Sequence, residues 1–228
     1  MTGKTHRVGG MVCCLGGYAL LEKNGMLLSN VSPLLQLAVM YPFAIYGSIV
    51  SDLDHNWHSS PSKDIVSFGI NKVLHLTSDI RDRMGEKSTS YKMLGLFDSR
   101  HRSWQTHSDM FLLAMFYIAW VMLSGSVNSA DQVLLRLIFS GLILGVISHL
   151  LLDMLTPEGI WSFITMAIGR LFKIKHVPEK ISFVPDNKFF RTGGTWENLV
   201  RSIMWGICII LVIRLIYSIS PYRIDFIF

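Results

Sequence analysis

A long apolar run in the second half of the chain carries two ionisable side chains near its end, and this feature restricts the fold more than any other. The run, VLLRLIFSGLILGVISHLLLDML, contains His149 and Asp153, four residues apart. Residues at this spacing project from the same face of a helix. A central Asp in a membrane helix costs roughly 2.5 to 3.5 kcal/mol on the insertion scale, so such residues are rare and indicate function. The run therefore predicts a membrane helix that presents an imidazole and a carboxylate to one point.

The composition places the chain among integral membrane proteins. Half of the residues are hydrophobic (50%) and the mean hydropathy is +0.41, which is too apolar for an ordinary soluble protein. A helix needs about 20 apolar residues to cross a bilayer. Apolar stretches lie at residues 8–21, 31–50, 109–126, 133–155 and 199–220. We therefore expect an all-α integral membrane protein with about five transmembrane or membrane-embedded helices.

The first apolar stretch differs from the others because it is short and rich in glycine. We expect it to be tilted or packed closely against a neighbouring helix, and it lacks the small-residue cleavage pattern of a signal peptide. Cys13, Cys14 and Cys208 lie inside apolar stretches and lack C-x-x-C spacing. They are therefore expected to be buried thiols, with no disulfide and no sulfur metal site.

Positive charge concentrates in two segments and predicts the orientation of the chain. The net charge is +5, and Lys and Arg gather in residues 56–108 and 170–191. The positive-inside rule places these segments and the N-terminus in the cytoplasm and the C-terminus outside. We expect one membrane-embedded domain, 1–228, with a cytoplasmic insert at 56–108 and a cytoplasmic loop at 170–198. Attraction to anionic lipid explains the basic loops better than nucleic-acid binding does.

Polar clusters from four separate segments fall at the same end of the predicted helices. They precede the first and third apolar stretches, follow the second and lie near the end of the fourth. The candidates are His6, Asp52, Asp54, His55, His101, Arg102, His107, His149 and Asp153. This convergence on one leaflet is independent of the charge argument, which used only Lys and Arg. It favours a shared site.

Histidine and aspartate in this combination favour a metal site. Imidazole nitrogen and carboxylate oxygen are ligands of Zn, Mn and Fe, with Zn the first expectation here, and a bound ion lowers the pKa of water and polarises a phosphoryl oxygen. The predicted ligands, sufficient for one or two ions, are His6, Asp52, Asp54, His55, His107, His149 and Asp153. Asp54 is alternatively a general base. Arg102 is a candidate for holding a phosphate, and His101 is a further catalytic candidate.

Each cluster also has a simpler interpretation. The Asp52-x-Asp54-His55 sequence is often a solvated turn, a histidine such as His6 near an N-terminus usually has no role, and His149 with Asp153 can be a structural hydrogen-bonded pair. Only their combination favours the site. Two weaker candidates for anion binding are Arg191 and the turn at 192–194, whose Thr-Gly-Gly sequence could expose backbone amides.

Taken in order, these motifs resemble a known family. Thr5-His6, Asp52-x-Asp54-His55, His101-Arg102 with Thr106-His107-Ser108, and His149-x-x-x-Asp153-x-x-Thr156-x-x-Gly159 look like the YdjM-like family of inner-membrane metal-dependent hydrolases, and Thr192-Gly193 with Glu197 fits its closing segment. The resemblance spans nearly the whole chain. It implies an α-helical membrane hydrolase distantly similar to zinc-dependent phospholipase C and related nucleases. The family name also carries a link to the LexA repressor, and none of these residues bears on that link.

The chain departs from the family pattern in three places. Ser51 stands where proline is expected before Asp-x-Asp, and residues 103–105 separate Arg102 from Thr106 where two residues are more usual, which bears on the role of His101. The insert at 59–99 is long, and we expect one amphipathic helix plus a mobile loop at the cytoplasmic surface, as a lid or a lipid-contacting element. The segment 173–196 predicts a short hairpin.

The expected function is hydrolysis of a phosphoester in a lipid or lipid-linked substrate at the cytoplasmic leaflet of a bacterial inner membrane. An amide or carboxylic ester substrate remains open. The alternative is a non-catalytic metal-binding membrane protein that regulates or binds a partner through its basic loops. A metal transporter is disfavoured because only His149 and Asp153 lie within a span, and toward its end.

Overall fold

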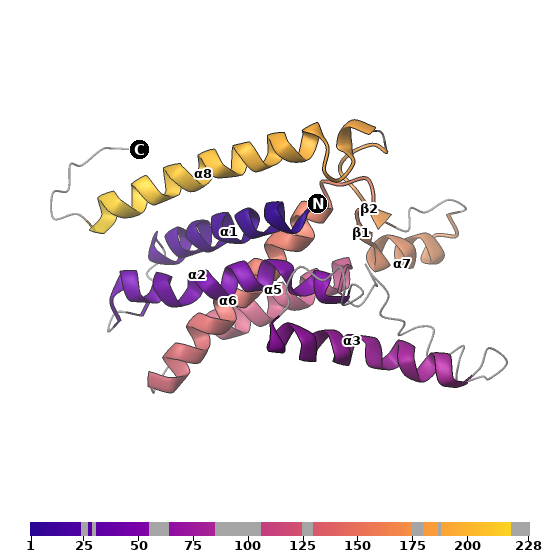
Figure 1. Ribbon diagram of the computed structural model, residues 1–228, viewed down its shortest axis with the longest axis horizontal. Coiled ribbons are helices and arrows are strands. Elements are labelled where there is room, and N and C mark those ends of the chain that lie inside the picture. The colour runs from indigo at the N-terminus through magenta and orange to yellow at the C-terminus, as the bar shows by residue number, and fades with distance from the viewer. Residues whose placement is uncertain are drawn as a thin grey trace.

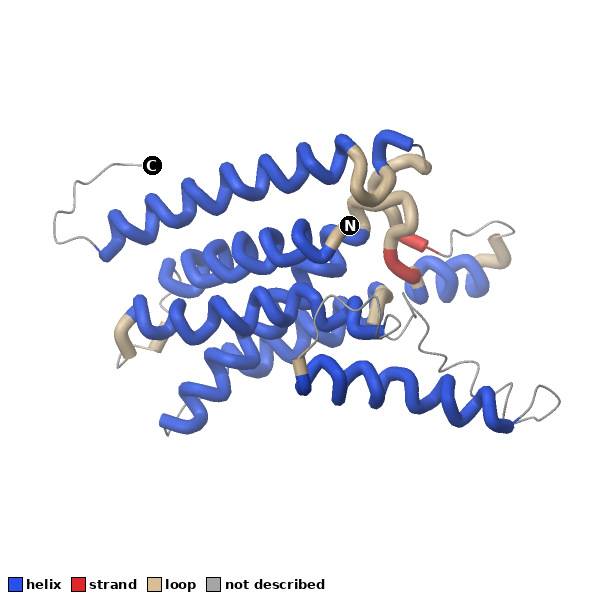
Figure 2. Tube along the Cα trace, in the orientation of Figure 1, coloured by secondary structure: helices blue, strands red, loops and turns tan. Residues whose placement is uncertain are grey.

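The chain forms a helical bundle with a small strand pair at one end. The computed structural model describes residues 1–23, 27–28, 31–54, 64–84, 106–124, 130–174, 180–186 and 188–219. Its elements are α1 (Gly3–Lys23), α2 (Pro33–Val50), the 3-10 turn η1 (Ser51–Asp54), α3 (Ile65–Met84), α5 (Asp109–Ser124), α6 (Ala130–Asp153), β1 (Ile160–Trp161), α7 (Phe163–Leu171), β2 (Lys180–Ile181), the 3-10 turn η4 (Lys188–Phe190) and α8 (Thr195–Ile219). Helix occupies most of the described chain (Figure 2). The predicted all-α class is confirmed.

Three helices form the centre of the bundle, and the others surround them. Helix α6 packs most extensively against α2, and α1 packs against both of them. Helix α8 covers the other side of α1, while α5 lies against α6 (Figure 1). The N-terminus, the strand pair and α7 lie at the same end of the bundle. Helices α1 and α5 run away from this end, and α2 and α6 run toward it, so four chain segments meet there.

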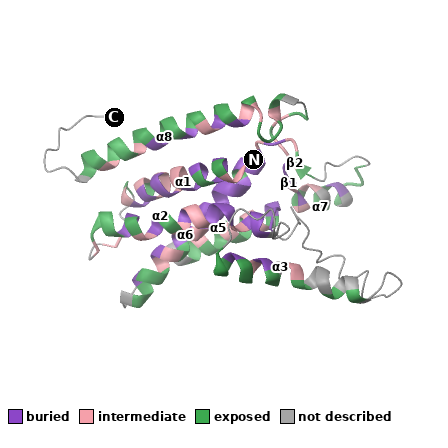
Figure 3. Ribbon diagram, in the orientation of Figure 1, coloured by how far each residue is buried: buried purple, intermediate pink, exposed green. Residues whose placement is uncertain are grey.

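Within the described ranges, three segments are long and apolar enough to cross a membrane. They are Pro33–Leu53, Asp131–Met154 and Thr195–Ser218, and a shorter apolar helix covers Asp109–Val121. Within these windows 61% of the α6 segment is buried but only 17% of the α8 segment. Figure 3 shows the same contrast, with buried residues gathered in α1, α2 and α6 and an exposed α8. Helix α6 is therefore the central helix of the bundle, and α8 exposes a long apolar surface.

Glycines allow the backbones of α2 and α6 to approach each other closely. A Cβ atom on Gly145 would lie 2.2 Å from the carbonyl oxygen of Ala44, and one on Gly47 would lie 2.2 Å from the carbonyl oxygen of Leu142. Small residues at these positions permit close helix packing, as in other membrane helix pairs. This approach brings the end of α6 directly beside the end of α2.

The insert after η1 contains the helix that the sequence predicts. Helix α3 lies within 59–99, and its apolar side chains include the exposed Ile65 and Val73. Two hydrogen bonds join its inner face to α2 and η1. The hydroxyls of Ser67 and of Tyr46 on α2 lie 2.9 Å apart, and the Asn71 side-chain amide donates to the carbonyl of Leu53 in η1. The predicted amphipathic helix is confirmed. The loop expected after it lies outside the described residues.

The strand pairing differs from the hairpin predicted within 173–196. Strand β2 pairs antiparallel with β1, with Ile160 opposite Ile181, so its partner precedes α7 in the chain. Gly159, at φ 57°, turns the backbone between α6 and β1. The Ser182 hydroxyl then donates to the Thr156 carbonyl at 2.6 Å and joins the two segments. The prediction of a local hairpin was wrong because strands of two residues carry no alternation to detect.

Candidate metal centre

Five predicted ligand residues from four chain segments meet at one end of the bundle. His6 lies in the first turns of α1, Asp52 in η1, His107 just before α5, and His149 and Asp153 in the last turns of α6. The side chains of His6, His107, His149 and Asp153 are 0% exposed. Buried polar groups of this kind require partners, because an unsatisfied one costs about 1 to 3 kcal/mol.

The donor atoms of His107, His149 and Asp153 have the spacing of ligands around one ion, and Asp52 lies beside the two histidines. The Nε2 atoms of His107 and His149 lie 3.1 Å apart, and each lies 3.4 Å from Asp153 Oδ2. Asp52 Oδ1 lies 3.8 Å from the first nitrogen and 3.6 Å from the second. A tetrahedral ion with metal–nitrogen bonds of about 2.0 to 2.1 Å separates its donors by about 3.3 to 3.4 Å. The observed distances bracket this value.

His149 is oriented so that only one of its nitrogens faces the cluster. Its Nδ1 lies 2.7 Å from the carbonyl oxygen of Ser48 on α2. A carbonyl can only accept, so Nδ1 carries the hydrogen, and in the neutral ring the Nε2 lone pair points at the other donors. A hydrogen bond of this kind is the usual support of a metal-binding histidine. The geometry therefore fits a ligand held ready by its neighbour.

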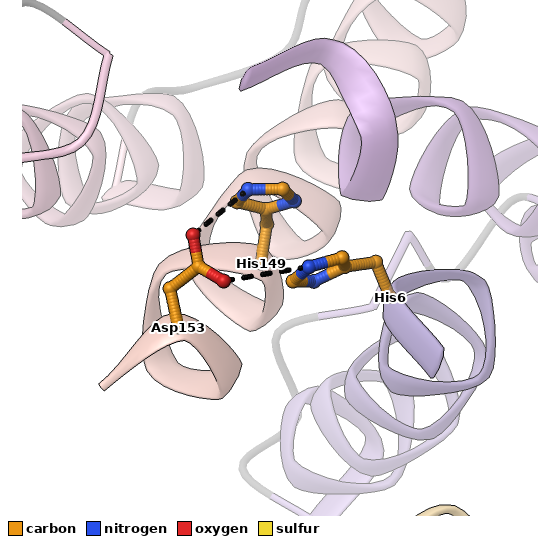
Figure 4. Close-up of side chains that lie close together, drawn as sticks. All are labelled: His6, His149 and Asp153. Atoms are coloured by element: carbon orange, nitrogen blue, oxygen red, sulfur yellow. Dashed lines mark ion pairs between the residues drawn. The ribbon is translucent and has the colours of Figure 1, made fainter. Parts of the chain in front are cut away.

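His6 completes the cluster from the side of α1. Its ring stacks on that of His149, with centroids 3.8 Å apart, and its Nε2 lies 3.5 Å from Asp153 Oδ1 (Figure 4). Neither ring nitrogen has a hydrogen-bond partner among the described residues. Burial is the main cause that holds the pKa of His6 well below its usual value, which favours the neutral ring. A neutral, buried imidazole without a hydrogen bond is suited to a metal ion.

Asp153 lies between two sets of donors. Its Oδ2 faces His107 and His149, while its Oδ1 faces His6 and the Met1 amino group, which is 3.2 Å away. Among the described residues, two groups of buried side chains could hold an ion: His6 with His149 and Asp153, and Asp52 with His107 and His149. His149 has one nitrogen to offer and can serve one ion only. Asp153, with two oxygens, can reach two.

Sequence comparison agrees with the resemblance carried by the motifs. Residues 1–222 match the family described as YdjM inner membrane protein. The chain belongs to the YdjM family. No curated protein and no solved structure matches the chain. The matched region includes all five clustered residues. The buried His and Asp residues that could hold a metal ion in this YdjM family member therefore lie within the part of the chain that the family shares.

The centre of this YdjM protein approaches the surface at η1. The Asp52 side chain is 13% exposed, whereas the side chains of His107 and Asp153 are fully buried. A catalytic metal site keeps one position open to water or substrate. Among the described donors, Asp52 marks the side from which either would approach.

One side-chain contact and one backbone contact hold His107 in place. The Thr106 hydroxyl lies 2.9 Å from Nδ1 of His107, and the His107 carbonyl accepts a hydrogen bond from the Trp161 amide at 2.8 Å.

Asp109 accepts hydrogen bonds from the amides of Phe163 and Ile164, both at 3.0 Å, and so caps α7 from a different helix. Sequence reasoning missed Asp109, because an acidic residue in the first turn of an apolar helix is expected to cap its own helix.

The structure does not place every predicted site residue in the cluster. His55, His101 and Arg102 lie outside the described residues, as does the side chain of Asp54, whose backbone ends η1. Arg191 is exposed and lines a surface cavity of about 420 Å³. The other residues that line the cavity are Pro157, Glu158, Asp186 and Thr192.

The anion site predicted at the turn 192–194 is wrong. The Gly193 amide donates to the Glu197 carboxylate at 2.6 Å, and the Gly194 amide donates to the Arg191 carbonyl at 3.0 Å. Both amides therefore have partners within the protein. The carboxylate four residues after Gly193 occupies the place where an anion would bind.

Proposed function

We propose that this YdjM family member is a multi-pass, metal-dependent membrane hydrolase. The proposal is carried by one observation: His107, His149 and Asp153 present three buried donor atoms 3.1 to 3.4 Å apart, with Asp52 next to them on the open side. A purely structural polar cluster would satisfy every member internally. Here the ring of His6 stays without a hydrogen-bond partner in the described part of the chain. A metal ion would supply one.

The proposed chemistry is attack of water on a phosphoester. A bound divalent ion would lower the pKa of a water molecule and polarise a phosphoryl oxygen. The protein's part is to hold the donors still: the Ser48 carbonyl fixes His149, and Thr106 supports His107. Hydrolysis requires a group that accepts the proton of the attacking water, and Asp54 is proposed for this role or as a further ligand. Arg102 is proposed to hold the phosphate, with His101 nearby in sequence.

The proposed substrate is a lipid or lipid-linked phosphate. The centre lies at the ends of two long apolar segments, Pro33–Leu53 and Asp131–Met154. In a bilayer such ends lie near headgroup depth, where phosphates are concentrated. The Lys and Arg residues of 56–108 and 170–191 favour this end as the cytoplasmic one. The whole chain, 1–228, would then act as a single membrane-embedded domain.

Metal content and turnover test this proposal together. The protein would be purified in detergent, its bound metals quantified, and its activity measured on phospholipids and isoprenoid phosphates. The matched pair is His149→Ala, which removes a donor, and His75→Ala, which alters a histidine of α3 outside the cluster. We expect about one or two ions per chain in the wild type and in His75→Ala, as catalytic zinc and paired-metal sites hold. Both metal and activity should be lost in His149→Ala.

Two results would contradict the proposal in different ways. A protein that binds no divalent ion under any loading condition would remove the metal centre altogether. A protein that holds its metal, loses it in His149→Ala and is inert on phosphate, amide and carboxylic ester substrates would instead be the alternative, a metal-binding module that regulates or binds a partner.

A further inference from the structure

Glu197 is a buried carboxylate that takes no part in the proposed chemistry. It lies in the first turn of α8, the least buried of the three candidate membrane spans among the described residues, and yet only 2% of its surface is exposed. A buried carboxylate is costly unless hydrogen bonds satisfy its oxygens. The partners of Glu197 therefore indicate what the residue is for.

Those partners are the start of α1 and the turn before α8. Oε1 accepts hydrogen bonds from the Thr2 amide at 2.7 Å and from the hydroxyls of Thr2 and Thr5. Oε2 accepts one from the Gly193 amide at 2.6 Å. One carboxylate thus joins the first residues of the chain to a helix that begins 190 positions later than Thr5. We name this set, Thr2, Thr5, Gly193 and Glu197, the N-terminal clasp.

The N-terminal clasp includes the residues that immediately precede His6 in the first turn of α1. The Thr2 carbonyl accepts hydrogen bonds from the amides of Thr5 and His6, at 2.9 and 3.1 Å, and Thr5 is the residue before His6. The His6 ring has no hydrogen bond of its own in the described part of the chain. Its position is therefore set by the backbone of the first turn of α1 and by stacking on His149. A contact that fixes the first turn of α1 therefore also fixes the position of the His6 ring.

We propose that Glu197 is a positioning residue of the metal centre, which sets His6 against Asp153 through the N-terminal clasp. The inference rests on the proposed metal centre. The hydrogen bonds of Glu197 go to Thr2, Thr5 and Gly193 and to none of the five clustered donor residues in the described part of the chain, so it acts through Thr2 and Thr5. In this arrangement α8 has a role beyond covering α1, because its first turn holds His6 in place beside the other four of the five clustered residues.

Glutamine is a sharp probe of this role because it keeps the shape of glutamate. Every partner of Glu197 named above is a donor, so both carboxylate oxygens accept. Glu197→Gln would place an amide NH₂ group against either the Gly193 amide or the Thr2 amide, so that two N–H donors would face each other, while the threonine hydroxyls can accept as well as donate. The N-terminal clasp would lose its hydrogen bond to either the Gly193 amide or the Thr2 amide, while the volume of the side chain stays nearly the same.

The test measures metal binding directly, on the full-length protein in detergent. Zn²⁺ affinity would be measured by competition with a chromophoric chelator, and Co²⁺ absorption would report the coordination of the ion. We expect Glu197→Gln to weaken Zn²⁺ affinity by about tenfold, the lower end of the effect of residues that support metal ligands. The Co²⁺ spectrum should also change. Glu22→Gln, the same substitution at the far end of α1, is the matched control and should change neither.

A second pair of variants covers the case in which Glu197→Gln fails to fold. Thr5→Val removes the hydroxyl that Glu197 accepts from and keeps the branched shape, whereas Thr5→Ser keeps the hydroxyl. We expect Thr5→Val to weaken Zn²⁺ binding and Thr5→Ser to restore it. Variants that melt at lower temperature but keep the wild-type Zn²⁺ affinity and Co²⁺ spectrum would overturn the inference and leave the proposed function intact. A wild-type protein that binds no metal would overturn both.

Discussion

Nδ1 of His149 donates a hydrogen bond to the carbonyl oxygen of Ser48 across a distance of 2.7 Å, and this bond joins the end of α6 to the end of α2. It fixes the ring so that Nε2 faces His107 and Asp153. The bond exists because glycines on both helices let the two backbones meet. Packing in the apolar part of the bundle therefore determines the geometry of the polar site.

Substitution of Gly145 should disturb this geometry. In Gly145→Ala the new Cβ would lie 2.2 Å from the Ala44 carbonyl oxygen and 2.6 Å from the Ser48 amide nitrogen, so α2 and α6 must separate. We expect a loss of about 1 to 3 kcal/mol in stability, typical of overpacking, together with weaker metal binding. Gly206→Ala on α8 is the control, because its Cβ would meet nothing within 4 Å. Equal melting temperatures and metal affinities for the two variants would contradict the role of close packing.

Asp153→Asn should remove metal binding more completely than any change outside the donor set. One oxygen of Asp153 faces His6 and the other faces His107 and His149. In either orientation of the Asn side chain, an NH₂ group, which cannot bind a metal ion, would replace one of these two oxygens. We expect Zn²⁺ affinity to fall at least about 100-fold, since loss of a mere supporting residue costs about 10- to 100-fold. Isothermal titration measures the change. Asp131→Asn, at the exposed opposite end of α6, should bind metal as the wild type does.

Asp109→Ala should loosen the segment that follows the centre. It removes the hydrogen bonds to the Phe163 and Ile164 amides and to the Ser162 hydroxyl. Loss of a helix cap costs about 0.5 to 2 kcal/mol, which lowers the melting temperature of a chain this size by a few degrees. Limited proteolysis should cut within α7 sooner than in the wild type. Asp186→Ala, at an exposed position in the loop after β2, should not change the cleavage rate.

Removal of metal should destabilise the protein, because an ion that binds only the folded state stabilises it by mass action. At a free metal concentration about 100 times the Kd the stabilisation is about 2.7 kcal/mol. Chelation should therefore lower the melting temperature, and added Zn²⁺ should restore it. In His149→Ala the melting temperature should not respond to either treatment. A wild-type melting temperature that is independent of chelator would argue against a bound ion.

Sequence patterning predicted the helices on which the site depends. The apolar stretch 133–155 corresponds closely to α6, and His149 and Asp153 project from the same face of it, as a spacing of four residues requires. The placement of Asp52 after α2 and of His107 before α5 followed from the ends of apolar stretches. The structure brings all of these side chains together because antiparallel helices of similar length end at the same level.

The contacts that hold the donors were not predictable in the same way. The Ser48 carbonyl belongs to the backbone, and no side-chain pattern distinguishes it from its neighbours. Asp109 caps a helix more than fifty positions away, which local capping rules do not anticipate. The clasp between Thr2 and Glu197 spans 195 positions. In each case tertiary packing makes the pairing, and a single sequence contains no periodicity that reports it.

The clasp at the start of α1 also has a consequence for biogenesis. Because Glu197 must reach Thr2 and Thr5, this end of the protein is complete only after α8 has been synthesised and has packed against α1. A chain stalled before that helix would have its first histidine unanchored. If the proposed ion binds, its loading would then follow the packing of α8 rather than precede it, and the loaded state would report a correctly folded chain.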